Sequence, residues 1–339
     1  MLPAMPRPVV LDVDTGLDDA CAILLAARHP DLDLLAVSCV GGNAPLDDVV
    51  ANTQTVLDAA NRPDVVVAAG APRPLLERPV HARHVHGEDG MGDLDWPRST
   101  RRPDPRPAVE VLRDVVRASA EPVTLVTLAP LTNIALLLRS YPDVARGLDG
   151  IVVMGGAVDV GNATASAEFN VFHDPEAAAV TFDAAADLGI PLTLYGLDVF
   201  YAPTVTLEQA RVLISADDPA TRLAGHLIEV QCRRFAAPAA TIGDAGAVCA
   251  VVDRTALHTE RLPLRVELGG SWSRGRTVVD RRSWTGDTSH DPHGISPVLV
   301  DVGLGVDGAR YAALWLDAVG SRRGETGPDA AQAGSTTRA

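Results

Sequence analysis

Aspartate side chains crowd one short stretch near the start of the chain, residues 9–25 (VVLDVDTGLDDACAILL). Carboxylates this close repel one another, and a helix macrodipole offers only about half a unit charge to offset them. A hard divalent cation such as Ca²⁺, which takes about six to eight oxygen ligands, is the better partner. The stretch therefore predicts a metal-binding or catalytic site, rather than acids that merely cap a helix or end a strand. The four aspartates are Asp12, Asp14, Asp18 and Asp19.

The residues around these aspartates predict the elements that hold them. Residues 9–13 form a β-branched and leucine-rich run typical of a buried strand, Thr15 and Gly16 break it, and residues 20–27 are apolar with helical character. A strand, a tight turn and a helix start make the first half of a βαβ unit. We therefore expect the carboxylates at the carboxyl end of a parallel strand, where open α/β sheets build their sites.

Strands and helices alternate along most of the chain, which predicts an α/β fold. We expect an open, doubly wound, mostly parallel sheet with helices on both faces and additional C-terminal strands. We also expect one domain over residues 1–320 and a disordered Gly- and Ser-rich tail over residues 321–339. Predicted strands are 9–13, 34–40, 65–69, 122–128, 151–154, 191–195, 264–268, 276–280 and 298–302, and predicted helices are 46–60, 109–119, 175–186, 206–234, 245–252 and 309–318.

Composition narrows the classes of function. The net charge of −15 disfavours nucleic acid or an anionic membrane surface as a partner. All 29 basic residues are arginine, which excludes Schiff-base chemistry and phosphate sites that need a lysine. No uninterrupted stretch reaches transmembrane length, and the N-terminus lacks the apolar core of a signal peptide. The four cysteines have no CxxC spacing, so we expect reduced core residues in a cytoplasmic protein.

Residues 70–107 break the alternation with seven prolines and a cluster of histidines at positions 81, 84 and 86. Loops this long inside a compact domain are usually lids or binding loops. HxxHxH is not a standard zinc spacing, so a solvated loop is a better interpretation of these histidines than a structural zinc site.

Seven motifs in this order resemble the nucleoside hydrolase family, whose members cleave the N-glycosidic bond of ribonucleosides. The resemblance spans residues 8–319, and its strongest part is the acidic motif together with GN…AEFN…DPEAA. The motifs are LDVDTGLDDACAI, VGGN, HGEDG, TLAPLTNIA, IVVMGGA, GNATASAEFNVFHDPEAA and GLD.

The resemblance implies the fold, one Ca²⁺ and a role for each matching residue. Asp14, Asp19, Asp244 and the Leu128 carbonyl would be metal ligands, and Asp14 would also be the base that deprotonates the attacking water. Asp12 would support its neighbours from just outside the site. The substrate would be a ribonucleoside, and we expect a homodimer or homotetramer. The ribose and base would be held by Asp18, Asn43, Asn162, Glu168, Asn170, Asp244 and His86.

The chain also departs from the family's pattern. Well-studied members have a histidine just before the last acidic ligand, where it is thought to protonate the leaving base, and this chain has Gly243. Thr15 replaces the motif's usual proline, and Cys21 lies in the helix after the acids. The ribose and metal chemistry look intact, whereas activation of the leaving group needs another donor. Candidate donors are His86, Tyr201, His226, His290 and His293.

Two alternatives remain at this point. Residues 9–15 also fit hhhDxDxT, the opening of haloacid dehalogenase-like phosphatases with Asp12 as nucleophile, but that family needs a lysine and this chain has none. The absence of a side chain at Gly243 also fits a catalytically impaired protein that binds nucleosides or ribose. A binder, however, would have no use for the full set of water-activating acids.

Overall fold

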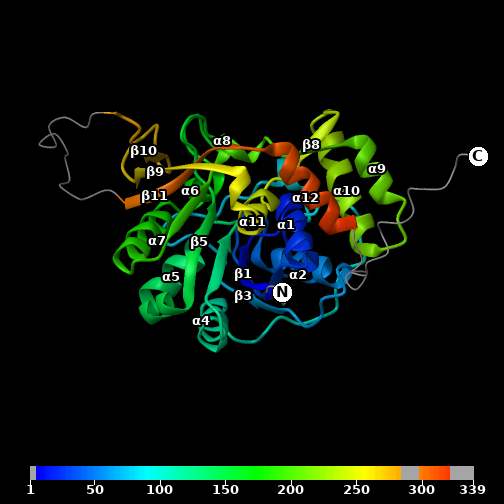
Figure 1. Cartoon of the computed structure of the whole chain (residues 1–339), viewed down its shortest axis with the longest axis horizontal. Helices are drawn as coiled ribbons and strands as arrows, with labels where there is room; N and C mark the ends of the chain where they lie inside the picture. The colour runs from blue at the N-terminus through cyan, green and yellow to red at the C-terminus, as the bar shows by residue number, and fades with distance from the viewer. Residues whose placement is uncertain (1–4, 284–297, 321–339) are drawn as a thin grey trace, which may run out of the picture.

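A nine-stranded sheet forms the centre of the protein in a computed structural model that describes residues 5–283 and 298–320. Neighbouring strands from β3 to β11 pair in parallel, whereas β9 pairs antiparallel with both β11 and β10 (Figure 1). The predicted mostly parallel α/β fold with additional C-terminal strands is confirmed. In spatial order the strands are β10 (Thr277–Val279), β9 (Leu257–Val266), β11 (Val298–Val306), β6 (Leu192–Tyr195), β5 (Leu148–Met154), β4 (Val123–Thr127), β1 (Arg7–Val13), β2 (Leu32–Cys39) and β3 (Val66–Ala69).

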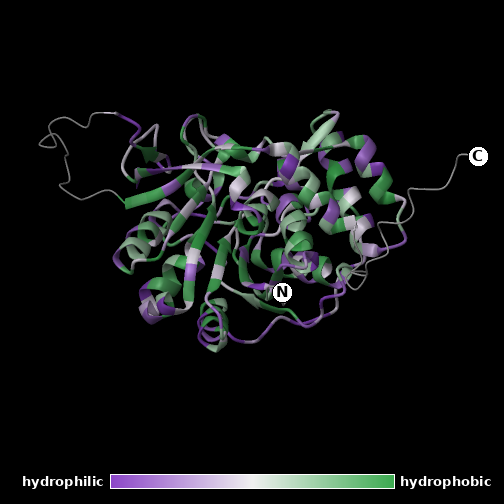
Figure 2. Cartoon of the chain, viewed as in Figure 1, coloured by the Kyte–Doolittle hydropathy of each residue, from purple (hydrophilic) through white to green (hydrophobic). Residues whose placement is uncertain are grey.

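Helices cover both faces of the sheet, so the central strands are apolar on both sides. On β1, Val9, Leu11 and Val13 pack on one face, with α1, α2, α10, α11 and α12, while Val10 packs on the other, with α4, α5 and α7. Figure 2 shows hydrophobic residues concentrated along the strands and the inner sides of these helices. These helices are α1 (Leu17–Arg28), α2 (Leu46–Ala59), α4 (Ala108–Ala118), α5 (Thr132–Ser140), α7 (Pro175–Asp187), α10 (Pro219–Arg234), α11 (Ala245–Val252) and α12 (Gly308–Gly320).

The order of the strands reverses at β1. The chain runs from β1 outward through β2 and β3 on one side, and from β4 through β5 and β6 on the other. The crevice at the carboxyl ends of β1 and β4 is the topological switch point, where open α/β sheets bind their ligands. Asp14 lies just beyond β1 and Leu128 just beyond β4.

One helix prediction was wrong in extent. Residues 206–234 form two helices, α9 (Leu207–Ile214) and α10, rather than one. The side chain of Asp218 accepts a hydrogen bond from the Thr221 amide and caps the second helix, and Pro219 occupies its first turn. Both features begin a new helix, so helical spacing alone overestimated its length. A two-stranded sheet, β7 (Thr204–Thr206) with β8 (Ala239–Thr241), flanks this pair.

The C-terminal strands are longer than predicted. β9 begins at Leu257, where the sequence predicted residue 264, and β11 extends to Val306, where it predicted 302. Arginine, glutamate and histidine on β9 obscure the alternation because this strand lies near the edge of the sheet. The remaining short elements are α3 (Arg83–His86), α6 (Phe169–His173), α8 (Leu197–Phe200), and 3₁₀ turns at Pro142–Gly147 and Arg254–Ala256.

Two further features bear on the sequence predictions. All four cysteines are buried and free, as expected of core thiols. Within residues 5–283 and 298–320, no helix is both long and apolar enough to cross a bilayer. The predicted tail at 321–339 and the candidate donors His290 and His293 lie outside the described residues.

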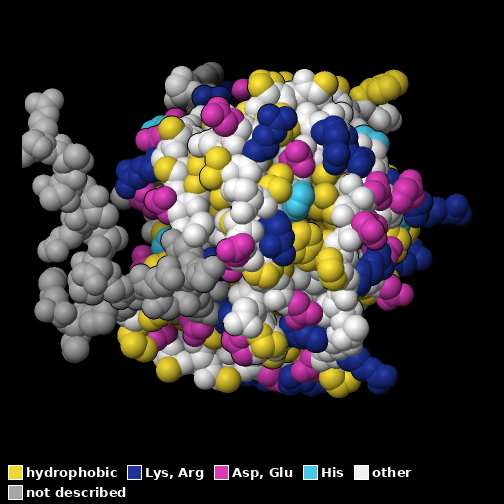
Figure 3. Space-filling model, turned by 90° about the vertical axis from the view of Figure 1, so that its right-hand side faces the viewer, with side chains coloured by type: hydrophobic (Ala, Val, Ile, Leu, Met, Phe, Trp, Pro, Cys, Tyr) yellow, Lys and Arg dark blue, Asp and Glu magenta, His cyan; other side chains and the backbone are white. Residues whose placement is uncertain are grey.

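Charged side chains alternate in sign on the face that carries α9 and α10. Figure 3 shows arginines and acidic residues interspersed there, with small apolar areas between them. The described part of this face therefore has no continuous basic surface of the kind that binds nucleic acid.

Candidate active site

A cavity of about 620 Å³ opens at the carboxyl ends of β1 and β4. Its volume lies within the range of about 300–1,000 Å³ typical of small-molecule sites. Most residues predicted to bind the substrate line it, although they come from segments spread over more than two hundred positions. The predicted residues on its wall are Asp18, Asn43, His86, Leu128, Asn162, Glu168, Asn170 and Asp244, together with the candidate donor Tyr201.

Acidic oxygens converge on the floor of this cavity. Oxygen atoms of Asp18, Asp19 and Asp244 all lie within 4.8 Å of one another, so these three carboxylates could hold a metal ion. Asp18 and Asp19 lie in the first turn of α1, and Asp244 directly precedes α11. Two helix N-termini therefore direct their positive ends at the cluster, which partly offsets its charge.

Asp14 lies beside this cluster and is fully buried. Its Oδ2 accepts a hydrogen bond from the Asn43 amide at 2.7 Å, whereas its Oδ1 is buried without a partner. Asp19 accepts hydrogen bonds from the amides of Asp14 (3.2 Å) and Gly16 (2.9 Å) and from Asn43 Nδ2 (3.3 Å). The three carboxylates that lie together are thus Asp18, Asp19 and Asp244, whereas the sequence predicted Asp14, Asp19 and Asp244 as the carboxylate ligands.

The Gly41-Gly42-Asn43 turn brings the Asn43 backbone to Asp14. A side chain at Gly42 would collide with Asp14 Oδ2, so only glycine permits this approach. The turn is also tied to the histidine-rich segment, because His81 Nδ1 contacts the Gly42 carbonyl oxygen at 2.8 Å and the Ala82 amide donates to the Asn43 carbonyl at 3.0 Å.

Glu168 and Asn170 line the opposite wall at the start of α6. The Glu168 carboxylate accepts hydrogen bonds from the amides of Gly156 (2.8 Å), Asn170 (2.8 Å) and Val171 (3.1 Å). Asn170 Nδ2 donates to the Leu128 carbonyl oxygen at 2.9 Å, which links this wall to the end of β4. Asn162 Oδ1 accepts from the Phe169 amide at 2.8 Å and closes the same loop.

Burial raises the pKa of four carboxyls around this cavity, those of Asp14, Asp19, Glu168 and Asp244. It raises the pKa of Asp19 and of Glu168 to about 7, and that of Asp14 and Asp244 well above the usual range. Repulsion between neighbouring carboxylates adds to the effect of burial for Asp14, Asp19 and Asp244. The cluster is therefore costly to ionise unless a cation is present.

Asp12 lies behind the floor rather than on it. It is fully buried on β1, and its Oδ1 accepts hydrogen bonds from the Ser38 hydroxyl and from Asn133 Nδ2 at 2.8 Å. Burial raises its pKa to about 7. Its backbone carbonyl accepts from the Leu128 amide at 2.8 Å, so the residue joins β1 to the end of β4. Asp12, like Asp14 and Asp19, is not among the residues that line the cavity.

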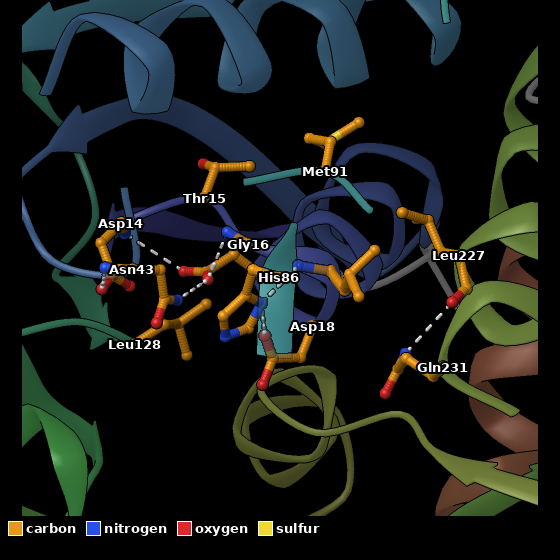
Figure 4. A network of polar contacts seen from close by, with 12 residues as sticks. Asp14, Thr15, Gly16, Asp18, Asn43, His86, Met91, Leu128, Leu227 and Gln231 are labelled. Atoms are coloured by element: carbon orange, nitrogen blue, oxygen red, sulfur yellow. Dashed lines mark hydrogen bonds and ion pairs between the residues drawn. The ribbon is translucent and has the colours of Figure 1, made fainter. Parts of the chain in front are cut away.

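His86 is fixed against the start of α1 (Figure 4). Its Nδ1 accepts a hydrogen bond from the Leu17 amide at 3.1 Å and lies 3.8 Å from Asp18 Oδ1. Burial lowers the pKa of this imidazole. Since Nδ1 is the acceptor, the neutral ring carries its hydrogen on Nε2. The histidine-rich segment therefore contacts the site through His86, as expected of a binding loop.

The other candidate donors differ in position. Tyr201 lines the cavity mouth and is 55% exposed. His226 is not on the cavity wall, and its ring lies 3.8 Å from Glu229 and packs edge-on against Trp96.

Comparison with known proteins agrees with this geometry. A family model described as inosine-uridine preferring nucleoside hydrolase matches residues 9–312. The pyrimidine-specific ribonucleoside hydrolase RihA of Shewanella sp. (strain MR-7) is 35% identical over 320 residues, 93% of this chain and 96% of that protein. The chain belongs to the nucleoside hydrolase family. It is therefore an enzyme of ribonucleoside hydrolysis, and the phosphatase alternative is wrong.

Solved structures of the family share the fold. A plant nucleoside hydrolase has a TM-score of 0.83 at 28% identity and covers 93% of this chain and 99% of its own. A purine-preferring ribonucleoside hydrolase from Gardnerella vaginalis has a TM-score of 0.82 at 27% identity and covers 92% and 98%. These relatives differ in the base that their names specify, so they assign no base preference to this nucleoside hydrolase.

Gly243 is packed too tightly to carry a side chain in this nucleoside hydrolase. Its φ is +55°, and a Cβ there would lie 2.5 Å from the Asp18 Cβ and 3.0 Å from the Phe200 Cζ. A substituent would push Asp18 away from Asp244, so the missing histidine is accompanied by a close approach of α1 and α11. The position cannot simply be refilled with a histidine.

Several residues of the site had no signal in the sequence. Gln231 and Phe235 line the cavity from the end of α10, but their spacing is that of ordinary helical residues. Arg274, in the loop between β9 and β10, donates to Glu77 at 2.9 Å and to Glu176 at 2.7 Å. It links the β9–β10 loop to the histidine-rich segment and to α7, and the hydrophobic periodicity of the sequence gives no sign of this contact.

We expect Gly243→Ala to reduce both stability and activity. A non-glycine residue with positive φ costs about 1–3 kcal/mol, and the added Cβ would also displace Asp18. Thermal unfolding and kcat/KM for uridine measure the two effects.

Gly189→Ala is the matched control, because Gly189 has a φ of +71° and nothing within 4 Å of the added Cβ. It should lose a similar amount of stability from backbone strain but retain its kcat/KM. Equal activity in the two variants would show that contact with Asp18 is unimportant.

Proposed function

We propose that this enzyme hydrolyses the N-glycosidic bond of ribonucleosides with the help of one Ca²⁺. Asp14, Asp19, Asp244 and the Leu128 carbonyl would hold the ion. Asp14 would accept a proton from the attacking water. Asp12 supports the site through its link between β1 and β4. The ribose hydroxyls would be held by Asp18, Asn43, Asn162, Glu168, Asn170 and Asp244, and the base by His86.

The observation that carries this proposal is the set of buried carboxylates without a counter-charge. Asp14 Oδ1 and Asp18 Oδ1 are buried and have no hydrogen-bond partner. Every donor atom in the cluster is an oxygen, which suits a hard cation such as Ca²⁺ better than a metal that prefers sulfur or nitrogen ligands. When bound, such a cation neutralises the carboxylates and makes a water molecule easier to deprotonate.

The residues on the walls fit the charge that develops during hydrolysis. Departure of the base leaves positive charge on the ribosyl ring, as in other glycosyl transfers. Carboxylates and amide oxygens around the ribose stabilise that charge because they are already oriented by backbone hydrogen bonds. Asn170 and Glu168 would contact the ribose hydroxyls and hold the sugar where water can attack C1′.

His86 is the donor best placed to assist the leaving base. With Nδ1 engaged by the Leu17 amide, Nε2–H remains to donate one hydrogen bond to the base. A neutral imidazole with a lowered pKa serves better as a hydrogen-bond donor than as a strong acid.

The compartment and assembly are also part of the proposal. Four buried free thiols fit a reducing compartment such as the cytoplasm. A homodimer or homotetramer stays a prediction.

We expect Ca²⁺ to raise the melting temperature more at pH 8 than at pH 5.5. The pKa of Asp19 rises from 3.8 to about 7 on folding, and that of Glu168 from 4.5 to about 7. Between those values the folded state binds more protons than the unfolded chain, so without a cation its free energy of unfolding falls as pH rises. A cation favours the ionised carboxylates and therefore helps most at high pH. Melting curves in EDTA, CaCl₂ and NaCl of equal ionic strength test this. If CaCl₂ gave the same melting temperature as EDTA and NaCl at both pH values, the proposed Ca²⁺ site would be excluded.

Asp14→Asn should lower kcat about 10²- to 10⁴-fold, the usual contribution of a general base. The amide keeps an oxygen to accept from the Asn43 backbone but cannot take a proton. Asn170→Ala is the comparison, since loss of a hydroxyl clamp affects KM as well as kcat. Release of ribose from a panel of nucleosides gives both constants. An Asp14→Asn enzyme that keeps more than about a hundredth of the wild-type rate would disprove the role.

His86→Ala should lower kcat/KM for uridine about 10- to 100-fold, the value of a hydrogen bond to a developing charge. p-Nitrophenyl riboside needs no such assistance, so its kcat/KM should fall much less. His84→Ala is the control, because His84 lines the same cavity but is exposed. Equal losses for both substrates would mean that His86 acts on the ribose end or on folding.

A further inference from the structure

The mouth of the cavity is apolar and aromatic, in contrast to its acidic floor. Tyr201 and Phe235 lie on the wall at this end and are more than half exposed, whereas Phe200 is buried and lies beside Gly243. Aromatic faces carry a negative quadrupole, and a cation placed over them is attracted. Both ends of the cavity therefore favour positive charge.

The described residues on the cavity wall include no arginine, and the chain has no lysine. Arg234 is close to His86, but its guanidinium donates to the backbone oxygens of Arg83 and His84 at 3.3 Å and pairs with Asp93 at 3.6 Å. Five carboxyl groups also lie in and beneath the cavity. They are Asp14, Asp18, Asp19, Glu168 and Asp244.

This charge distribution is unfavourable for one class of leaving group. When an uncharged nucleoside loses its base, the bonding electron pair stays on the ring nitrogen, and the base leaves as an anion unless it is protonated. Gly243 has no side chain to supply that proton, and His86 is held neutral with a single N–H to offer. An anion would thus form beside carboxylates, where it is repelled.

A riboside whose ring nitrogen is already cationic avoids this difficulty. As its C1′–N bond breaks, the electron pair neutralises the ring, and the positive charge moves to the ribosyl group. Water then forms the C1′–O bond and gives its proton to Asp14. The products are ribose, an uncharged heterocycle and one proton. Positive charge stays within the acidic cavity throughout, and no donor is needed at position 243.

We propose that this cavity prefers N-ribosides of cationic heterocycles, the quaternary pyridinium ribosides, over uncharged nucleosides. The inference rests on the proposed hydrolysis and names the substrate class of the same site. Its basis is the juxtaposition of an acidic floor, an aromatic mouth without arginine, and the side-chain-free Gly243.

The test compares three ribosides on the wild-type enzyme: nicotinamide riboside, p-nitrophenyl riboside and uridine. The first two both leave without protonation, but nicotinamide leaves uncharged and p-nitrophenolate leaves as an anion, so their ratio isolates the effect of charge. We expect kcat/KM for nicotinamide riboside to exceed that for uridine at least tenfold, and to exceed that for p-nitrophenyl riboside.

Two substitutions of the exposed Phe235 then separate charge from the loss of the ring. Phe235→Leu removes the ring alone, whereas Phe235→Arg also adds a positive charge at the mouth. Relative to Phe235→Leu, the arginine variant should lower kcat/KM for nicotinamide riboside about three- to tenfold, as expected for one added charge near solvent. It should raise kcat/KM for p-nitrophenyl riboside relative to Phe235→Leu, because the added positive charge attracts the departing anion.

Each outcome decides something. Cleavage of uridine faster than nicotinamide riboside, or equal effects of the two Phe235 variants on all three substrates, would overturn the preference and leave ribonucleoside hydrolysis standing. If none of the three ribosides released ribose, the proposed function itself would be overturned.

Discussion

Burial of several carboxylates at one point is the constraint on which the rest of the site depends. Asp14 and Asp19 have no exposed surface, and Asp244 has almost none. Oxygen atoms of Asp18, Asp19 and Asp244 nevertheless lie within 4.8 Å of one another. The protein offsets part of this charge with two helix N-termini and with backbone N–H donors. Those partial charges are too small to neutralise the cluster, so the fold alone leaves a demand for a cation.

The same constraint explains why glycines occupy two particular positions. Gly42 lets the Asn43 amide reach Asp14, and Gly243 lets the start of α11 lie against Asp18. A side chain at Gly42 would displace Asp14, and one at Gly243 would displace Asp18. The chain thus has no proton donor at position 243, where the close approach of Asp18 leaves no room for a side chain.

The sequence predicted the elements that depend on local pattern. A buried strand followed by a tight turn and a helix start placed Asp12, Asp14, Asp18 and Asp19 correctly, because strand and helix periodicities are local properties. It could not predict that Asp18 would join the geometric cluster while Asp14 turned to Asn43, since that depends on a turn twenty-nine positions away. Nor could it give the φ of Gly243 or the tautomer of His86, which arise from contacts between distant segments.

The β9–β10 hairpin links two irregular segments around the cavity that sequence periodicity does not predict. Thr277 Oγ1 accepts from the Ala157 amide at 2.9 Å and donates to the Ala157 carbonyl at 2.8 Å, which fixes the start of the loop that carries Glu168. Arg274 ties the same hairpin to Glu77 in the histidine-rich segment. Walls held in this way reach the transition state with little reorganisation, and preorganisation is what makes dipoles and carboxylates effective in catalysis. The antiparallel strands at the sheet edge contribute no residue to the acid cluster, yet their hairpin is hydrogen-bonded to both segments that wall the cavity.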